Sequence, residues 1–154
     1  KVANLSNNAH SSKDDAKLSL ENCATLISIN ISANILFIDD SLFSQCYMLK
    51  SISVDPNNLQ FSSIDGILFT KNFETLLCFP ANHYLTTYTI PISVTSIGNS
   101  AFSHCSNLKS IAIPSSVTSI GNSAFSHCSK LQSITIPTSV TSIGDSAFSG
   151  CSNL

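Results

Sequence analysis

Arginine and tryptophan are absent from this sequence, and only 10% of its 154 residues carry a charge. An average soluble domain has about 25% charged residues, and serine and threonine take their place here. Seven lysines against nine acidic residues give a formal net charge of -2. A nucleic-acid-binding protein would need a face rich in arginine or lysine, so the composition excludes that class.

Long hydrophobic runs are also missing. No apolar segment approaches the roughly 18 residues that indicate a membrane-spanning helix, and residues 1–15 lack the apolar core of a signal peptide. The chain begins without a methionine and stops inside a repeated motif. We therefore interpret it as a piece of a longer protein, in which missing targeting signals say nothing about the compartment.

The dominant feature that is present is an internal repeat with a period of 23 residues. Self-similarity at a fixed period is typical of solenoids, in which each repeat forms one turn. The unit reads I-P-x-S-V-T-S-I-G-x-S-A-F-S-x-C-S-x-L-x-S-I-x, with regular copies at 90–112, 113–135 and 136–154. The recurring apolar columns are Ile97, Ile120 and Ile143, Phe102, Phe125 and Phe148, Cys105, Cys128 and Cys151, and Leu108, Leu131 and Leu154.

The same register predicts a single repeat domain over residues 1–154, with about six turns in four parts. The parts are a polar N-terminal segment (1–18), earlier repeats (19–53), a variant repeat with an insertion (54–89), and three regular repeats of which the last is truncated (90–154). Within the first part, HSSKDDAK has lost the apolar positions, as a terminal cap would. The variant repeat contains GILFT-KNFE-TLLCFP, two apolar stretches around a polar turn, which predicts a β-hairpin.

Each turn is predicted to add one strand to a parallel sheet. In L-x-S-I-x-I the two isoleucines share a face, and the following proline ends the strand because it lacks an N–H. We expect strands near 26–31, 49–54, 85–90, 108–113 and 131–136, in one sheet on the order of 25–30 Å wide. The segment N-S-A-F-S-H-C is too short for a full helix, so a helical or 3₁₀ turn is expected there. Phe125 should be buried and Ser126 exposed.

The repeat unit closely resembles the BspA-like class of leucine-rich repeats. Residues 31–53 and 90–154 carry its motif, and S-S-I-D-G-I-L-F-T-K-N-F-E-T-L-L-C-F-P resembles a hairpin variant found between repeats of that class. The resemblance implies a leucine-rich-repeat solenoid with a parallel sheet on one face, short strands and helical or 3₁₀ turns on the other, and one inserted β-hairpin. It further implies a surface or secreted protein associated with adhesion, although a fold alone does not fix a function.

Five of the six cysteines share one repeat position: Cys23, Cys46, Cys105, Cys128 and Cys151. Neighbouring turns bring their Cα atoms near disulfide distance, but translation keeps the Cβ vectors parallel rather than convergent. We therefore predict a column of reduced, buried thiols that behave as small hydrophobic side chains. Cys78, in the expected hairpin, is predicted to be free as well.

His104 and His127 each precede a cysteine of this column and suggest a metal site. However, Gly150 replaces the histidine in the third copy, and no C-x-x-C or H-x-x-x-H spacing occurs. We predict exposed loop histidines, with no metal and no cofactor. Serines at repeated positions and Asp39–Asp40 in an expected solvated turn offer no nucleophile with a base, so no catalytic residue is assigned and the protein is not expected to be an enzyme.

The outward strand positions form ladders of small polar side chains. The candidate binding face consists of Ser51, Ser53, Thr87, Thr89, Ser110, Ala112, Ser133 and Thr135. In a structural interpretation these residues are strand formers that keep the sheet soluble. In a functional interpretation they form a broad, weak contact surface, because solenoid faces are commonly used for binding.

The leading functional hypothesis is a cell-surface or secreted adhesion module that binds host or matrix protein, or glycan, through the solenoid face. The alternative is a cytoplasmic leucine-rich-repeat scaffold for protein–protein interaction. Reduced thiols slightly favour the scaffold, whereas low charge and abundant serine and threonine slightly favour the surface. We expect no nucleic-acid partner and no membrane insertion, and the truncated last turn predicts fraying over 137–154 and self-association. The N-x-S sequons at Asn4 and Asn30 leave glycosylation open.

Overall fold

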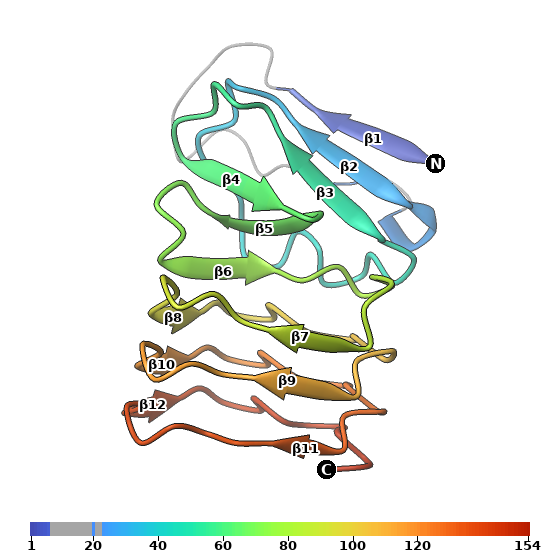
Figure 1. The fold of residues 1–154 in the computed structure, drawn as a ribbon. Helices are drawn as coiled ribbons and strands as arrows, with labels where there is room; N and C mark the ends of the chain where they lie inside the picture. The colour runs from blue at the N-terminus through green and yellow to red at the C-terminus, as the bar shows by residue number, and fades with distance from the viewer. Residues whose placement is uncertain (7–19, 21–22) are drawn as a thin grey trace.

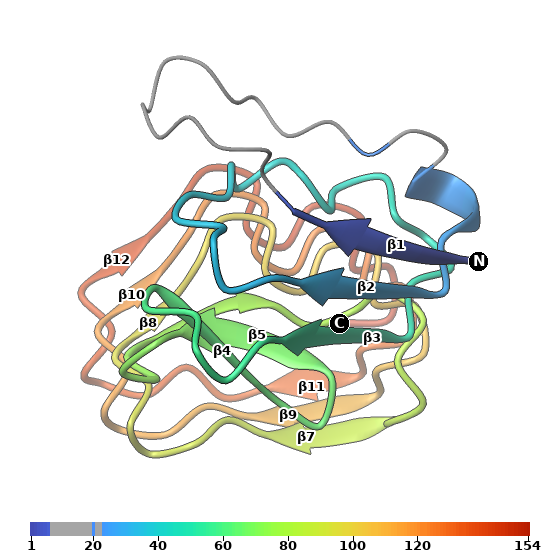
Figure 2. The ribbon, with the colours of Figure 1, turned by 90° about the horizontal axis from the view of Figure 1, so that it is seen from above.

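The computed structural model describes residues 1–6, 20 and 23–154. Its turns stack along one axis, from β1 at one end to β11 and β12 at the other (Figure 1), and overlap around a common interior when seen from above (Figure 2). The solenoid prediction is confirmed, although the cap expected at HSSKDDAK lies outside the described residues. The single helix among the described residues is the 3₁₀ turn η1 (Cys23–Thr25). No described helix is long and apolar enough to cross a membrane.

The strands on the front of the solenoid form two parallel sheets, not one. The first sheet contains β1 (Val2–Leu5), β2 (Ser28–Ile31) and β3 (Ser51–Val54). The second contains β7 (Thr87–Thr89), β9 (Ser110–Ala112) and β11 (Ser133–Ile134). The prediction of one continuous sheet is therefore wrong. The strand β1 was also not expected in a segment that appeared only polar.

A third sheet explains the division. It contains β4 (Phe61–Ile64), β5 (Ile67–Thr70) and β6 (Thr75–Cys78), followed by the short back strands β8 (Ser96–Ile97), β10 (Ser119–Ile120) and β12 (Ser142–Ile143). The predicted hairpin is confirmed as β5 and β6, which pair antiparallel. β4 extends it to a three-stranded meander through Asp65–Gly66, where φ is 51° and 79°. An Asp-Gly pair between apolar stretches is a strong hairpin signal.

The meander β4–β6 lies between β3 and β7 (Figure 1). Ile52 of β3 donates its N–H to the carbonyl oxygen of Gly66 at 2.9 Å, and Val54 donates to the hydroxyl oxygen of Ser63 at 3.1 Å. These bonds occupy the edge of β3 that would otherwise meet β7. Successive side chains of β5 point to opposite sides, so Leu68 packs in the N-terminal core and Phe69 in the C-terminal core. The meander is thus a partition between two cores.

The C-terminal core is built on a column of phenylalanine rings. The ring centroids of Phe79 and Phe102 are 5.1 Å apart, those of Phe102 and Phe125 are 4.9 Å apart, and those of Phe125 and Phe148 are 5.4 Å apart. Phe102 and Phe125 have no exposed surface. No single turn could bury such a ring, so each turn depends on its neighbours.

The N-S-A-F-S-H-C segments are turns rather than helices. Ser100 and His104 have φ of 55° and 60°, a left-handed conformation that interrupts a right-handed helix. Some backbone hydrogen bonds lie within a turn and others join neighbouring turns. Ser103 donates to Ser100 within the turn at 3.0 Å, whereas Phe102 donates to Ala124 of the next turn at 2.7 Å. The expectation of a helical turn overlooked this bonding between turns.

The serine that follows Phe125 is not exposed, contrary to the sequence-based expectation. Ser126 is only 7% exposed. Its hydroxyl oxygen lies 2.8 Å from that of Ser103, the equivalent residue of the preceding turn. Stacking aligns equivalent side chains, so Ser126 is covered by the neighbouring turns and bonds to Ser103 instead of pointing into solvent.

Candidate functional site

The regular cysteines form the predicted column of free, buried thiols. Cys105, Cys128 and Cys151 each donate their S–H to the carbonyl oxygen of the phenylalanine in the preceding turn, at 3.4, 3.1 and 3.0 Å. Cys151 is only partly buried, and Cys78 is free and buried as predicted. Burial raises the pKa of the Cys78 thiol to about 12 and also raises that of Cys105. The Cys78 and Cys105 thiols are therefore poor nucleophiles.

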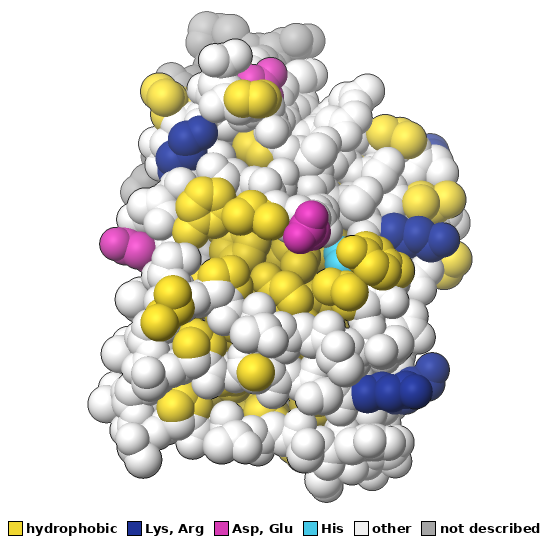
Figure 3. All heavy atoms as spheres, viewed as in Figure 1, with side chains coloured by type: hydrophobic (Ala, Val, Ile, Leu, Met, Phe, Trp, Pro, Cys, Tyr) yellow, Lys and Arg dark blue, Asp and Glu magenta, His cyan; other side chains and the backbone are white. Residues whose placement is uncertain are grey.

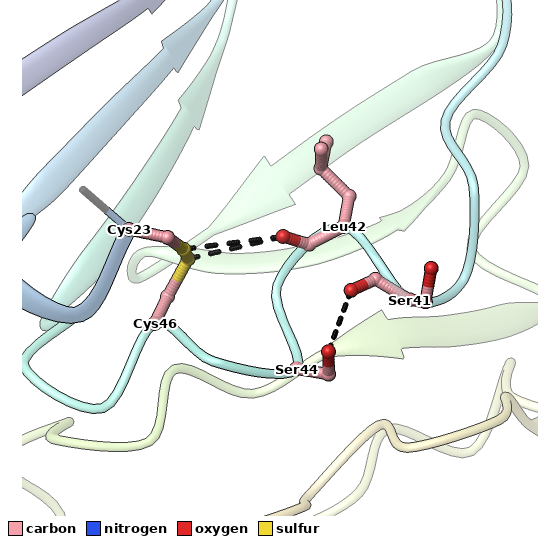
Figure 4. The surroundings of a disulfide bond; sticks show 5 residues. All are labelled: Cys23, Ser41, Leu42, Ser44 and Cys46. Atoms are coloured by element: carbon pink, nitrogen blue, oxygen red, sulfur yellow. Dashed lines mark hydrogen bonds between the residues drawn. A yellow bond between two sulfur atoms is a disulfide. The ribbon is translucent and has the colours of Figure 1, made fainter. Parts of the chain in front are cut away.

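The first two cysteines of the column depart from the prediction and form a disulfide, Cys23–Cys46 (Figure 4). Their Cα atoms are 4.6 Å apart, within the usual range for a disulfide. Both sulfurs lie 3.9 Å from the carbonyl oxygen of Leu42, so neither is turned toward a preceding phenylalanine. The prediction of reduced thiols is therefore wrong for Cys23 and Cys46.

The two repeat histidines stack on one another. The ring centroids of His104 and His127 are 4.6 Å apart, and the ring of Tyr47 meets His104 edge-on at 4.9 Å. His127 is exposed as predicted, whereas His104 is only half-exposed. Burial, with a smaller effect from His127, lowers the pKa of His104. Within the described residues no cluster of three or more His, Cys, Asp or Glu side chains could hold a metal ion.

A ladder of amides, not recognised in the sequence, runs along the back of the solenoid. Asn122 and Asp145 donate their backbone N–H groups to the side-chain oxygens of Asn99 and Asn122, each at 2.8 Å. At the other end, Asn99 donates its side-chain N–H to the carboxylate of Asp40 at 2.8 Å. An open groove of about 400 Å³ follows this ladder. Because the side-chain oxygens of Asn99 and Asn122 already accept backbone N–H groups of the next turn, we assign the ladder a structural role.

The residues predicted to form a binding face are divided between two sheets. Ser51 and Ser53 lie on the first front sheet, and the other six candidates lie on or beside the second: Thr87, Thr89, Ser110, Ala112, Ser133 and Thr135. All are exposed except Ser51, which is half-buried beside Gly66 of the meander. On the second sheet, parallel pairing aligns equivalent residues into ladders. The result is an uncharged face that no described segment covers.

Between the two front sheets the surface changes character. Hydrophobic side chains gather at the level of the meander, next to an acidic side chain and a histidine (Figure 3). The buried ring of His83 has its Nε2 2.8 Å from the carbonyl oxygen of Asp65, and its Nδ1 accepts the N–H of Leu85 at 3.3 Å. Tyr84 stacks on His83 at 4.6 Å and is 75% exposed. Burial and the charge of Asp65 raise the pKa of Tyr88 to about 12.

This junction was not predicted from the sequence, but two features of the sequence contribute to it. Tyr88 takes the strand position that Ile111 takes in the next turn, so a hydroxyl replaces a purely apolar side chain. The Asp65–Gly66 turn places a carboxylate on the same side. The junction combines an exposed tyrosine ring and apolar surface, which are typical elements of a protein-binding surface, with an adjacent carboxylate.

Comparison with known proteins places these features in a family. A family model described as BspA type leucine-rich repeat region matches residues 4–76 and 77–154, with six copies. A leucine-rich repeat protein from Eubacterium ventriosum is 32% identical, with a TM-score of 0.79, and the match covers 84% of this chain and 41% of that one. A leucine rich cell surface protein from Faecalibacterium prausnitzii is 30% identical, with a TM-score of 0.64 and coverages of 84% and 40%.

A third structure shares the fold alone. The pneumococcal vaccine antigen PcpA is 23% identical, with a TM-score of 0.77, and the match covers 84% of this chain and 38% of PcpA. The chain therefore spans less than half the length of each of these three proteins. A search of curated proteins finds no match.

Proposed function

The chain belongs to the family of BspA-type leucine-rich-repeat proteins, and from that premise we propose that it is a non-catalytic binding module of a cell-surface or secreted protein. The observation that carries the proposal is the exposed, uncharged face of the second front sheet, which no described segment covers. Solenoid faces are commonly used for binding. The partner is a host or matrix protein, with a glycan as the competing outcome of the test below.

Two further observations support a location outside the cytosol. The relative from Faecalibacterium prausnitzii is described as a cell surface protein. The Cys23–Cys46 disulfide also suits an oxidising compartment, because cytosolic thiols are kept reduced. The disulfide reverses the small preference for a cytoplasmic scaffold that an entirely reduced column would have given.

Self-association belongs to the same proposal. The last turn leaves Ile143 49% exposed and Leu154 51% exposed. The outer edges of β11 and β12 pair with no other described strand. In the isolated 154-residue chain, an apolar surface beside open strand edges would favour contact with a second copy.

Charges introduced on the front face should weaken binding. We expect Ser110→Lys with Ser133→Lys to lower the affinity of the wild-type ligand by about tenfold or more, because two lysines must be desolvated in the contact. The measurement is solid-phase binding of purified chain to a panel of immobilised matrix proteins and glycans. It identifies the ligand and its class before the variants are compared.

The matched control places the same charges elsewhere. Thr118→Lys with Thr141→Lys adds two lysines on adjacent turns at exposed positions of the back, and its affinity should stay close to that of the wild type. Equal losses of affinity in both double variants would mean that the front face is not the binding surface. A wild-type chain that binds no member of the panel would contradict the proposed function itself.

A further inference from the structure

β7 is an edge strand inside the body of the solenoid. Ile90 donates its N–H to Ala112 at 3.0 Å, and Thr86 accepts the N–H of Lys109 at 2.7 Å, so the even-numbered residues of this segment bond to β9. Backbone groups of successive residues point to opposite edges of a strand. The N–H and C=O groups of Thr87 and Thr89 therefore point away from β9, and no described residue pairs with them.

The meander causes this opening. One turn further along, the equivalent residues Ser110 and Ala112 bond across to β7. Regular stacking would likewise pair Thr87 and Thr89 with β3. That edge of β3 is taken instead by Gly66 and Ser63. The open edge of β7 is thus internal, between the meander and the regular turns, and does not depend on either end of the chain.

Natural proteins protect exposed edges with lysine, proline, bulges or a covering segment. The sequence of β7 is Thr-Tyr-Thr, which has none of these protective residues. Asp65 is exposed on the meander side, and its charge acts on Tyr88 of β7. The exposed ring of Tyr84 precedes the strand, and hydrophobic side chains gather on the same surface (Figure 3).

We propose that the open edge of β7 binds an extended peptide segment of a partner protein by strand addition. This inference rests on the proposed function and specifies its partner. An extended polypeptide supplies donors and acceptors at the spacing of Thr87 and Thr89, which the hydroxyl groups of a glycan do not reproduce. The carboxylate of Asp65 selects a peptide with lysine or arginine, and the Tyr84 ring packs against the aliphatic stem of that side chain.

The probe is a synthetic peptide of about nine residues, with alternating threonine and valine and a central lysine. Two control peptides are compared with it. One has a central glutamate in place of the lysine, and the other keeps the lysine but has an N-methylated backbone. Fluorescence polarisation measures affinity, and amide hydrogen exchange locates the contact. We expect protection of the Thr87 and Thr89 amides, a preference for lysine over glutamate, and a loss of about tenfold or more on N-methylation.

Two substitutions of Thr89 distinguish a contribution of its backbone N–H to peptide binding from a contribution of its side chain. Thr89→Pro removes the N–H that points to the open edge but none that bonds to β9, and proline is tolerated at such edge positions. Thr89→Val keeps that N–H. We expect the proline variant to lose about tenfold or more in peptide affinity and the valine variant to bind as the wild type does. Asp65→Asn should abolish the preference for lysine.

Each other outcome is decisive. Peptide protection that appears only on β11 or β12, or peptide affinity unchanged by both Thr89→Pro and N-methylation, would overturn strand addition at β7. If Thr89→Pro fails to fold, the N-methylated peptide still gives the answer on wild-type protein. If the panel ligand of the front face binds normally while no peptide binds β7, strand addition fails and the proposed function stands. If the peptide binds β7 but no panel ligand binds the chain, strand addition stands and the proposed function fails.

Discussion

Replacing Phe125 with alanine will lower the free energy of unfolding by about 3–5 kcal/mol, the usual cost of truncating a buried phenylalanine. The ring has no exposed surface and stacks between Phe102 and Phe148, with interplanar angles of 12° and 1°. Its loss opens a cavity across two interfaces between turns. Urea unfolding followed by circular dichroism measures the change.

Gln132→Ala is the matched surface control. Gln132 is exposed and lies in the same turn, so its replacement should change stability by no more than about 0.5 kcal/mol. Ser126, which the sequence suggested for this purpose, is unsuitable because it is buried and paired with Ser103. Equal unfolding midpoints for Phe125→Ala and Gln132→Ala would mean that the stacking register is wrong.

Adding one methyl group at Gly121 should be nearly as damaging. A Cβ atom there would lie 2.6 Å from the backbone nitrogen of Asn99 and 2.6 Å from its side-chain oxygen. The turns would have to separate, which also weakens the bond from Asn122 to Asn99. We expect Gly121→Ala to cost about 2–4 kcal/mol, from overpacking together with a lost hydrogen bond, measured by the same urea unfolding.

Gly98→Ala provides the comparison at the same repeat position. The nearest atom to its Cβ would be the carbonyl oxygen of Leu76, at 3.1 Å, so a small shift accommodates it. This variant should lose clearly less stability than Gly121→Ala. An equal loss of stability in Gly98→Ala and Gly121→Ala would show that glycine is needed for its own backbone conformation, and not for the close approach of neighbouring turns.

The sequence predicted the features that repeat. The spacing of Phe102, Phe125 and Phe148 located a ring column, and the apolar stretches around KNFE located the hairpin. These predictions succeeded because stacking turns at a fixed period forces equivalent residues into contact. The family resemblance rested on the same periodicity.

The features that the sequence did not predict arise where the repeat is interrupted. The meander could lie outside the solenoid or divide the front sheet. The outcome depends on which residue accepts the N–H of Ile52, and the repeat period does not predict that residue. The Cys23–Cys46 disulfide joins two members of a cysteine column whose later members are free, and the shared repeat position does not distinguish the two groups. Ser126 and the Asn99 ladder were missed because polar side chains at repeated positions were assigned to solvent rather than to one another.

The candidate binding face was predicted as a set of positions, but its extent was not. The eight residues were expected on one sheet, whereas Ser51 and Ser53 lie beyond the meander from the rest. The junction around Asp65, Tyr84 and Tyr88 could not be assembled from the sequence, because it depends on how the insertion meets β7.

Amide hydrogen exchange on the free protein shows whether β7 has an open strand edge within the binding face. Thr87 and Thr89 have N–H groups that point to the open edge, whereas Ser110 and Ala112, at the equivalent positions of β9, are paired with β7. The account predicts rapid exchange at Thr87 and Thr89 and strong protection at Ser110 and Ala112. Equal protection at all four amides would mean that β7 is already paired, and would contradict it.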